Sequence, residues 1–389
     1  MNALFLAFAH LRFTWARSLI MVFVGALILA VPLISQIILR GGEETLTRRA
    51  DATPLVLGAR GSQLDLVMNA VYFSEDRADP VTMAASEGVW DSGLALPIPL
   101  HTAFEASGAR IVGTSLDYFD FRGLNYAQGR SFAVLGEAVI GATVAERLGL
   151  GPGDTIVSSP ENLFDLDGIY PLEMQIVGVL APTASPDDEA VFVDVKTAWV
   201  IAGIGHGHED VITADEADDA GNLRAAASIV EFNRITPDNI DSFHFHGAPG
   251  DYPVSAILIA PYDQRSGTIL RGRYLDPENP LQIVVPAEVV GSLVDRIFRI
   301  KSLLDAVTLI IGVAALSAIA LALYLGWRLR APEMATARRI GAGRGMILQL
   351  AAAEIVLLLV GAFANSVLIV LVVRSQGDYL VGWLLALGT

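Results

Sequence analysis

The sequence predicts an α-helical membrane protein that carries one large α+β domain outside the membrane. Three uncharged apolar runs predict the membrane part, at residues 18–39, 306–327 and 355–373. These runs contain 22, 22 and 19 residues, and about 20 helical residues are enough to cross a hydrocarbon core of ~30 Å. Residues 40–301, between the first two runs, have the composition of a soluble domain.

Positive charge near the ends of these runs predicts the orientation. The loop at 328–344 carries five arginines against one acid, Glu333, and two more arginines, Arg12 and Arg17, precede the first run. Because Lys and Arg beside a span are retained in the cytoplasm during insertion, both flanks are expected there. Residues 40–301 are therefore expected on the opposite side.

The outer segment is strongly acidic. It holds 18 Lys or Arg and 38 Asp or Glu, a balance of −20 against a formal net charge of −16 for the whole chain. A domain of this charge argues against nucleic acid as a partner. The chain contains no cysteine, which excludes a disulfide framework and thiolate metal sites.

Short strands alternate with short helices in the outer segment, which is typical of an α+β domain. Because this segment begins and ends at the membrane, we expect two lobes, with the distal lobe inserted into the proximal one. Residues 205–221 predict an exposed acidic loop. The expected strands are 54–57, 109–113, 138–140, 174–180, 190–195, 228–233, 254–260 and 281–285, and the expected helices are 142–148, 196–201 and 287–301.

The first 17 residues predict a cytoplasmic helix that lies in the membrane interface. The alternative is that they simply begin a longer first helix. We interpret the first apolar run as an anchor and not as a cleaved signal, because its 22 residues exceed the ~7–15 apolar residues of a signal peptide.

The cytoplasmic loop reads RLRAPEMATARRIGAGR and predicts a short basic helix at residues 331–340. Pro332 suits the first turn of this helix, and Gly341 suits its end. A basic helix that projects between two spans offers a soluble partner a surface to push against. The alternative is that its arginines serve only to fix the topology.

Motifs of a known family occur in order along the chain. The loop joins Glu333 to an Arg-x-x-Gly-Ala turn at 338–342, and Glu354 follows early in the next run. The outer segment carries EAVI at 137–140, AERL at 145–148, GPGD at 151–154 and IVGVL at 176–180. In these features the chain resembles the FtsX/MacB/LolC family of ABC-transporter permeases, over most of its length.

The resemblance implies a dimer, expected to be a homodimer, that binds two ATPase subunits in the bacterial inner membrane and sends ATP-driven movement to a MacB-like periplasmic domain. The chain has no G-x-x-x-x-G-K-[ST] phosphate loop, so ATP hydrolysis is expected from a separate chain, and this one is expected not to be an enzyme. The implied coupling residues are Glu333, Arg338, Arg339, Ile340, Gly341 and Ala342.

One feature departs from the family, whose members usually have four spans. Residues 379–388 offer ten apolar residues, only ~15 Å of helix, so the sequence predicts three spans and leaves a short fourth open. The expected segments are an interfacial helix at 1–17, spans at 18–39, 302–327 and 346–374, the periplasmic domain at 40–301, the coupling loop at 328–345 and an apolar tail at 375–389.

Glu354 lies within an apolar run, where a carboxylate facing lipid is unfavourable, so we expect it to face other helices. One hypothesis makes it a proton or gating site. The alternative is a hydrogen-bonded packing residue near the cytoplasmic boundary.

Four of the six histidines form two H-x-H pairs, which predicts a metal site. Residues two apart on a strand face the same side, and neutral imidazole is a common zinc ligand. The alternative is solvated loop histidines beside a hairpin whose aromatic residues are core. The segment 233–247 is similar to permeases that accompany zinc-handling systems. The candidate ligands are His206, His208, His244 and His246, with Glu231, Glu209 or Asp241 as a possible carboxylate.

The leading hypothesis is a non-catalytic permease subunit whose cargo is a lipoprotein or other amphiphile, or a metal such as zinc. Its expected partners are the cytoplasmic ATPase, membrane lipid, a second copy and a periplasmic or lipoprotein partner. The alternative is a membrane adaptor that activates a periplasmic partner, such as a cell-wall hydrolase, without transporting anything. A periplasmic hydrolase is a third hypothesis, but no nucleophile and base stand at interpretable spacing.

Overall fold

The computed structural model describes residues 2–74, 79–159, 171–207, 233–341 and 343–375. The chain divides into two compact units, a membrane unit of Met1–Glu44 with Val294–Thr389, and an outer unit of Thr45–Leu293. The expected strand at 228–233 and the apolar tail at 375–389 fall almost wholly outside the described residues.

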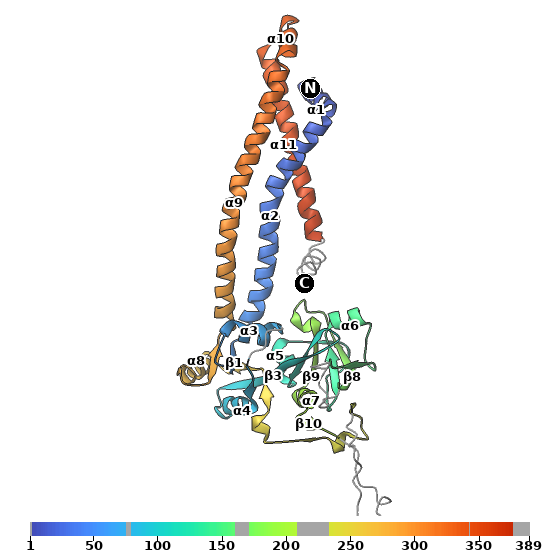
Figure 1. Cartoon of the computed structure of the whole chain (residues 1–389), viewed down its shortest axis with the longest axis vertical. Helices are drawn as coiled ribbons and strands as arrows, with labels where there is room; N and C mark the ends of the chain where they lie inside the picture. Colours follow the sequence, from blue (N-terminus) through green and yellow to red (C-terminus); the bar gives the residue numbers. More distant parts are fainter. Residues whose placement is uncertain (1, 75–78, 160–170, 208–232, 342, 376–389) are drawn as a thin grey trace, which may run out of the picture. The chain divides into compact units, whose positions relative to one another are not determined.

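The membrane unit is helical (Figure 1). Within the described residues, three helices are long and apolar enough to cross a membrane: Trp15–Ile37, Pro286–Leu329 and Gly345–Ser375. Many of their large apolar side chains are exposed, as expected for helices solvated by lipid. The prediction of an α-helical membrane protein with three spans is therefore confirmed over the described residues, and the possible short fourth span at 379–388 lies outside them. The helices are α1 (Asn2–Phe13), α2 (Trp15–Asp51), α9 (Pro286–Leu329), α10 (Ala331–Arg339) and α11 (Arg344–Ser375).

Two of these helices continue beyond their apolar runs. The helix α2 extends to Asp51, and α9 begins at Pro286 and runs unbroken for 44 residues. The compact outer unit, Thr45–Leu293, is consequently shorter at both ends than the expected 40–301. The apolar run in α2 therefore continues without a break into a polar helical segment, and the apolar run in α9 is preceded by one.

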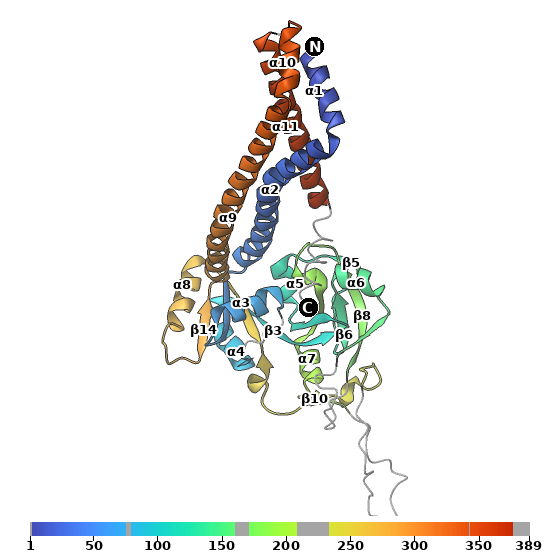
Figure 2. The ribbon, with the colours of Figure 1, turned by 45° about the horizontal axis from the view of Figure 1, so that its top comes forward.

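The outer unit is built on one ten-stranded mixed sheet (Figure 2). The pairs β4 with β9 and β6 with β8 are parallel, and all other pairs in the sheet are antiparallel. The strand order is β14 (Leu281–Val284), β1 (Leu55–Ala59), β13 (Ala256–Pro261), β3 (Ala95–Ala106), β4 (Ala109–Thr114), β9 (Ala190–Asp194), β6 (Glu137–Ile140), β8 (Glu173–Leu180) and β5 (Tyr126–Gly129), with β7 (Thr155–Val157) also on β8.

Helices and two short ribbons complete the unit. The α+β architecture is therefore confirmed. The helices are α3 (Gln63–Tyr72), α4 (Met83–Asp91), α5 (Asp117–Arg122), α6 (Ala142–Leu148), α7 (Val195–Ile201) and α8 (Gln264–Arg273), with 3-10 turns η1 (Pro186–Glu189), η2 (Ile240–Ser242) and η3 (Pro249–Asp251). The ribbons pair β2 (Val81–Thr82) with β12 (Pro253–Val254), and β10 (Gly205–His206) with β11 (His244–Phe245).

Two hydrophobic cores among the described residues lie on one shared sheet, and the expected division of the outer unit into two lobes stays a prediction. One core contains residues of β1, β13 and α8, near the two ends of the unit's chain. The other contains residues of β4, β6, β8 and β9, which lie between them in sequence. The sheet runs through both cores.

The strand β3 contributes to both cores, and it was not predicted from the sequence. Its first half pairs with β13 from Ala95 to Leu100, and its second half pairs with β4 from Leu100 to Ala106. Pro97 and Pro99 argue against a central strand because proline donates no ladder hydrogen bond. They are tolerated here because the half that holds them has a partner on one side only.

Arg49, in the last turn of α2, forms a buried network with three other segments. Its guanidinium donates to both carboxylate oxygens of Asp187, at 2.5 and 2.9 Å, to the carbonyl oxygen of Val71 and to the hydroxyl of Tyr118. The Tyr118 hydroxyl donates to Asp187 at 2.6 Å. Burial alone would raise the pKa of Asp187, but the hydrogen bond and charge of Arg49 hold it below its ordinary value.

Replacing Asp187 with Asn should strongly destabilise the outer unit, because it leaves the Arg49 charge buried without its counter-ion. The expected loss is about 3–5 kcal/mol of unfolding free energy, measured by urea unfolding of the full chain in detergent. The double variant Arg49→Leu with Asp187→Leu should recover most of the loss, since it removes both charges. An Asp187→Asn protein as stable as the parent would contradict this role.

His101 on β3 is buried beside Phe104, and neither ring nitrogen has a hydrogen-bond partner among the described residues. Burial lowers its pKa from 6.5 to about 4. The folded state therefore holds this imidazole neutral at a pH where the unfolded chain protonates it.

The outer unit should lose stability as the pH falls from 6.5 towards 4, because in this window only the unfolded chain binds the proton at His101. The full loss corresponds to roughly 3 kcal/mol. Replacing His101 with Phe should flatten this part of the pH dependence and leave stability above pH 7 nearly unchanged. Parallel pH profiles for parent and variant, measured by urea unfolding, would show that the histidine is not responsible.

Candidate functional site

The short ribbon of β10 and β11 carries the histidines. After α7 the chain turns at Gly203, whose φ of +74° favours glycine, and enters β10. The strands are antiparallel, with Gly205 opposite Phe245 and His206 opposite His244. The amide of His246 donates to the carbonyl of Ile204 at 3.1 Å and extends the pairing by one residue. The exposed loop expected from residue 205 therefore begins with a strand.

The two faces of this ribbon differ sharply. Phe243 and Phe245 pack against the buried core. A Cβ atom added to Gly205 would lie 2.6 Å from the ring of Phe245, and one added to Gly207 would lie 2.6 Å from the ring of Phe243. Glycine is required at both positions because the phenyl rings lie directly over the backbone. The histidines, which alternate with these residues, face the other way.

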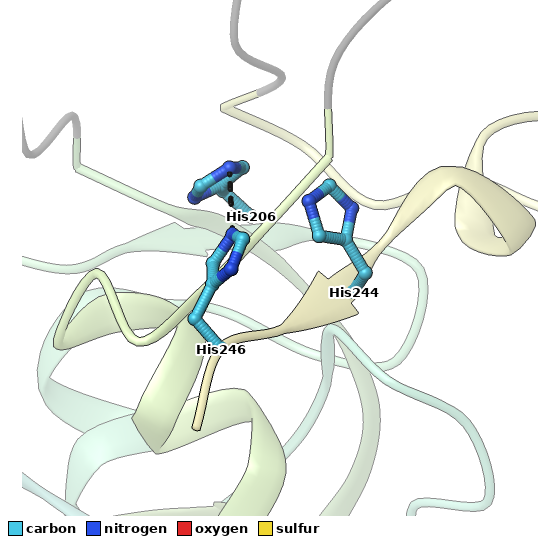
Figure 3. A group of neighbouring side chains, drawn as sticks. All are labelled: His206, His244 and His246. Carbon is cyan, nitrogen blue, oxygen red and sulfur yellow. Dashed lines mark hydrogen bonds between the residues drawn. The ribbon is translucent and has the colours of Figure 1, made fainter.

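Three imidazoles converge on this outer face (Figure 3). The ring centroids of His206, His244 and His246 are 4.9 Å apart in every pair. One nitrogen from each lies within 4.8 Å of the others, and the Nε2 atoms of His206 and His246 are 3.4 Å apart. All three side chains are at least partly exposed. This arrangement can present three neutral nitrogens to one cation.

Ser242 orients one of these rings. The Nδ1 atom of His244 lies 3.0 Å from the Ser242 carbonyl oxygen, which can only accept a hydrogen bond. The proton of neutral His244 therefore belongs on Nδ1, which makes Nε2 the atom of the ring that can accept a hydrogen bond or bind a metal. A backbone carbonyl that fixes the tautomer of a histidine in this way is a common feature around metal ligands.

The structure brings together three of the predicted histidines. His208, Glu209 and Glu231 lie outside the described residues. Asp241, the other suggested carboxylate, is described but is not part of the cluster. The Ser242 carbonyl could not be identified from the sequence, because a backbone group leaves no sequence signal.

The short helix predicted at residues 331–340 is present as α10, between α9 and α11, and its coupling role stays a prediction. Pro332 lies in its first turn, and Gly341 follows with a φ of +108°. Arg338, Arg339 and Ile340 are exposed, and Ile340 is 83% exposed. Glu333 lies in α10, but its side chain and Ala342 fall outside the description.

A groove of about 390 Å³ lies beside α10. Its lining is mostly apolar, with two arginines and one carboxylate. The residues that carry this character are Trp327, Met334, Arg338, Ile347, Ala351 and Glu354. An exposed basic helix therefore stands next to an apolar depression within the membrane unit.

Glu354 on α11 is buried and accepts a hydrogen bond from Arg330 at 2.8 Å. The same carboxylate oxygen lies 3.1 Å from Nδ1 of His10 on α1. Glu354 thus links α1 and α11 to the residue that joins α9 to α10. Neither Arg330 nor His10 was identified from the sequence, because both are far from Glu354 along the chain.

If Glu354 is a packing residue, Glu354→Gln should keep most of the stability of the membrane unit, because an amide oxygen still accepts from Arg330. Glu354→Leu removes the acceptor and should lower the melting temperature of the full chain in detergent by several degrees more. Equal melting temperatures for the Gln and Leu variants would argue against this packing role.

Comparison with known proteins places this architecture in a family. The MacB-like periplasmic core domain matches residues 20–230, more than half of the 389 residues. The chain therefore belongs to the MacB/FtsX-like family of ABC-transporter permeases. It is a membrane protein with a periplasmic domain, as the resemblance of its motifs implied. Among curated proteins no sequence matches the chain.

Two solved structures are similar to the chain at low identity. The periplasmic region of MacB from Actinobacillus actinomycetemcomitans has 10% identity and a TM-score of 0.36, covering 62% of this chain and 92% of that one. The extracellular domain of the noncanonic ABC-type transporter YknZ from Gram-positive bacteria has 12% identity and a TM-score of 0.33, covering 59% and 98%.

Proposed function

We propose that this chain is the non-catalytic membrane subunit of an ABC transporter in a bacterial inner membrane, and that α10 is where a separate cytoplasmic ATPase docks. The observation that carries the proposal is the placement of α10. It is a short basic helix between two candidate spans, and its exposed end lies beside an apolar groove.

The chemistry of this surface suits a folded protein partner. Arg338 and Arg339 occupy the last turn of α10 and are exposed to solvent, so they can meet acidic side chains. The exposed Ile340 and the groove supply apolar area at the same place. Interfaces that combine an apolar centre with a charged rim are typical of stable protein complexes. A topological role alone explains the arginines but not the groove.

Movement of α10 has a continuous route to the periplasmic domain. Arg330 follows α9 directly, and its amide donates to the carbonyl oxygens of Gly326 and Trp327. The helix α9 then runs unbroken for 44 residues to Pro286, about 66 Å of helix, and begins two residues after β14. A helix of this kind can act as a lever between an ATPase and the sheet.

In this proposal two copies of the chain form a homodimer that binds two ATPase subunits, and residues 40–301 lie in the periplasm. The cargo is a lipoprotein or another amphiphile, or a metal ion. The adaptor hypothesis uses the same docking and differs only at the periplasmic end, where the domain would activate a partner such as a cell-wall hydrolase.

Replacing Arg338 and Arg339 with Glu should abolish co-purification of the full chain with its ATPase, because the charge that meets the partner is reversed. The matched control is Arg374→Glu, which reverses an arginine at the far end of α11 and should leave the complex intact. An unchanged complex with the double variant would refute docking at α10.

A further inference from the structure

We propose that His206, His244 and His246 form a binding site for one divalent transition-metal ion such as zinc. Their three imidazoles are the ligands that the described residues supply. This inference deepens the proposed function by naming the class of ion that the periplasmic domain would bind.

The distances suit a metal of this size. Two imidazole nitrogens bound tetrahedrally to zinc at ~2.0–2.1 Å are about 3.3 Å apart. The Nε2 atoms of His206 and His246 are 3.4 Å apart. The third ring belongs to the same group of nitrogens, all within 4.8 Å of one another. A small rotation of side chains that are at least partly exposed brings His244 to the same distance.

The protonation of the rings also suits a metal. Two ring nitrogens only 3.4 Å apart cannot both carry protons that point at each other. The Ser242 carbonyl holds the proton of His244 on Nδ1, which directs the Nε2 lone pair away from that carbonyl. Nitrogen lone pairs gathered in one place are what a cation needs.

The packing beneath the ribbon holds the rings in this geometry. Phe243 and Phe245 are held in the core, and Gly205 and Gly207 admit their rings against the opposite strand. Alternation along a strand then forces the intervening histidines onto the outer face. The ribbon is therefore ordered by apolar contacts before any ion binds, which reduces the entropy lost on binding.

The donor set selects the kind of metal. Imidazole nitrogen favours zinc, copper and nickel, whereas magnesium and calcium prefer oxygen ligands. Among the described residues the cluster contains no carboxylate, and the chain has no cysteine to supply a thiolate. The net charge of the surrounding segment, −20, attracts cations without distinguishing among them. Among the described residues, selection against Mg²⁺ and Ca²⁺ therefore lies with the three rings.

The described residues supply three protein ligands. Structural zinc sites usually have four protein ligands, and sites that keep an open position have three. The rings lie at the surface of the domain, where water or a donor atom from a binding partner can reach a bound ion.

The test is metal binding by the purified full chain in detergent. Zinc is titrated against a chromophoric chelator, and cobalt is added separately because its visible spectrum reports the ligands. We expect one Zn²⁺ per chain, no competition from excess Mg²⁺, and a cobalt spectrum of nitrogen ligation. Each of His206→Ala, His244→Ala and His246→Ala should weaken zinc binding about 100-fold or more, since loss of even a supporting group costs 10–100-fold.

Asp241→Asn is the matched control. It changes an ionisable residue on the neighbouring turn η2 and should leave zinc affinity and the cobalt spectrum unchanged. The proposal is overturned if the three single variants bind zinc as the parent does, or if the control alone loses binding. Melting temperatures of all variants show whether each is folded, and loss of the cobalt spectrum at an unchanged melting temperature supports direct ligation.

The zinc-binding test and the ATPase co-purification test can fail independently of each other. A chain that binds zinc but not the ATPase would keep the metal site and refute docking at α10. A chain that binds the ATPase but not zinc would keep the proposed function and remove metal from its cargo.

Discussion

The buried charge of Arg49 is the constraint on which the arrangement of the outer unit depends. A guanidinium removed from water is very unfavourable unless it is paired and fully hydrogen-bonded. Asp187 and Tyr118 come from 69 or more residues further along the chain, and with the carbonyl of Val71 they meet this need. The last turn of α2, the end of α3, α5 and η1 must therefore converge before the domain is stable.

The strand β3 shows both the reach and the limit of prediction from sequence. Strands with short continuous apolar runs, such as β6 and β9, were predicted within a few residues, because burial on both faces leaves a clear signal. The longest strand of the sheet, β3, was not predicted because it contains two prolines. Their tolerance depends on which neighbour is present at each half of the strand, and such pairing between distant segments is not visible locally.

The candidate sites also differ in how far their residues could be predicted from the sequence. The helix α10 follows from local signals, since proline, glycine and arginine occupy positions with a direct structural meaning. The histidine pairs were recognised from their spacing, yet only tertiary pairing decides that His206 joins His244 and His246. Arg330 and His10 around Glu354 could not be predicted, because they are brought together by packing between helices.

The alternation of phenylalanine and histidine on the ribbon makes its two faces interchangeable by a single step in register. Insertion of one residue between η2 and β11 would turn the imidazoles inward and the phenyl rings outward. An inserted pair of residues would preserve both faces. Length variation in this part of the chain is therefore tolerable only in even steps, a restriction imposed by the pleat itself and independent of any ligand.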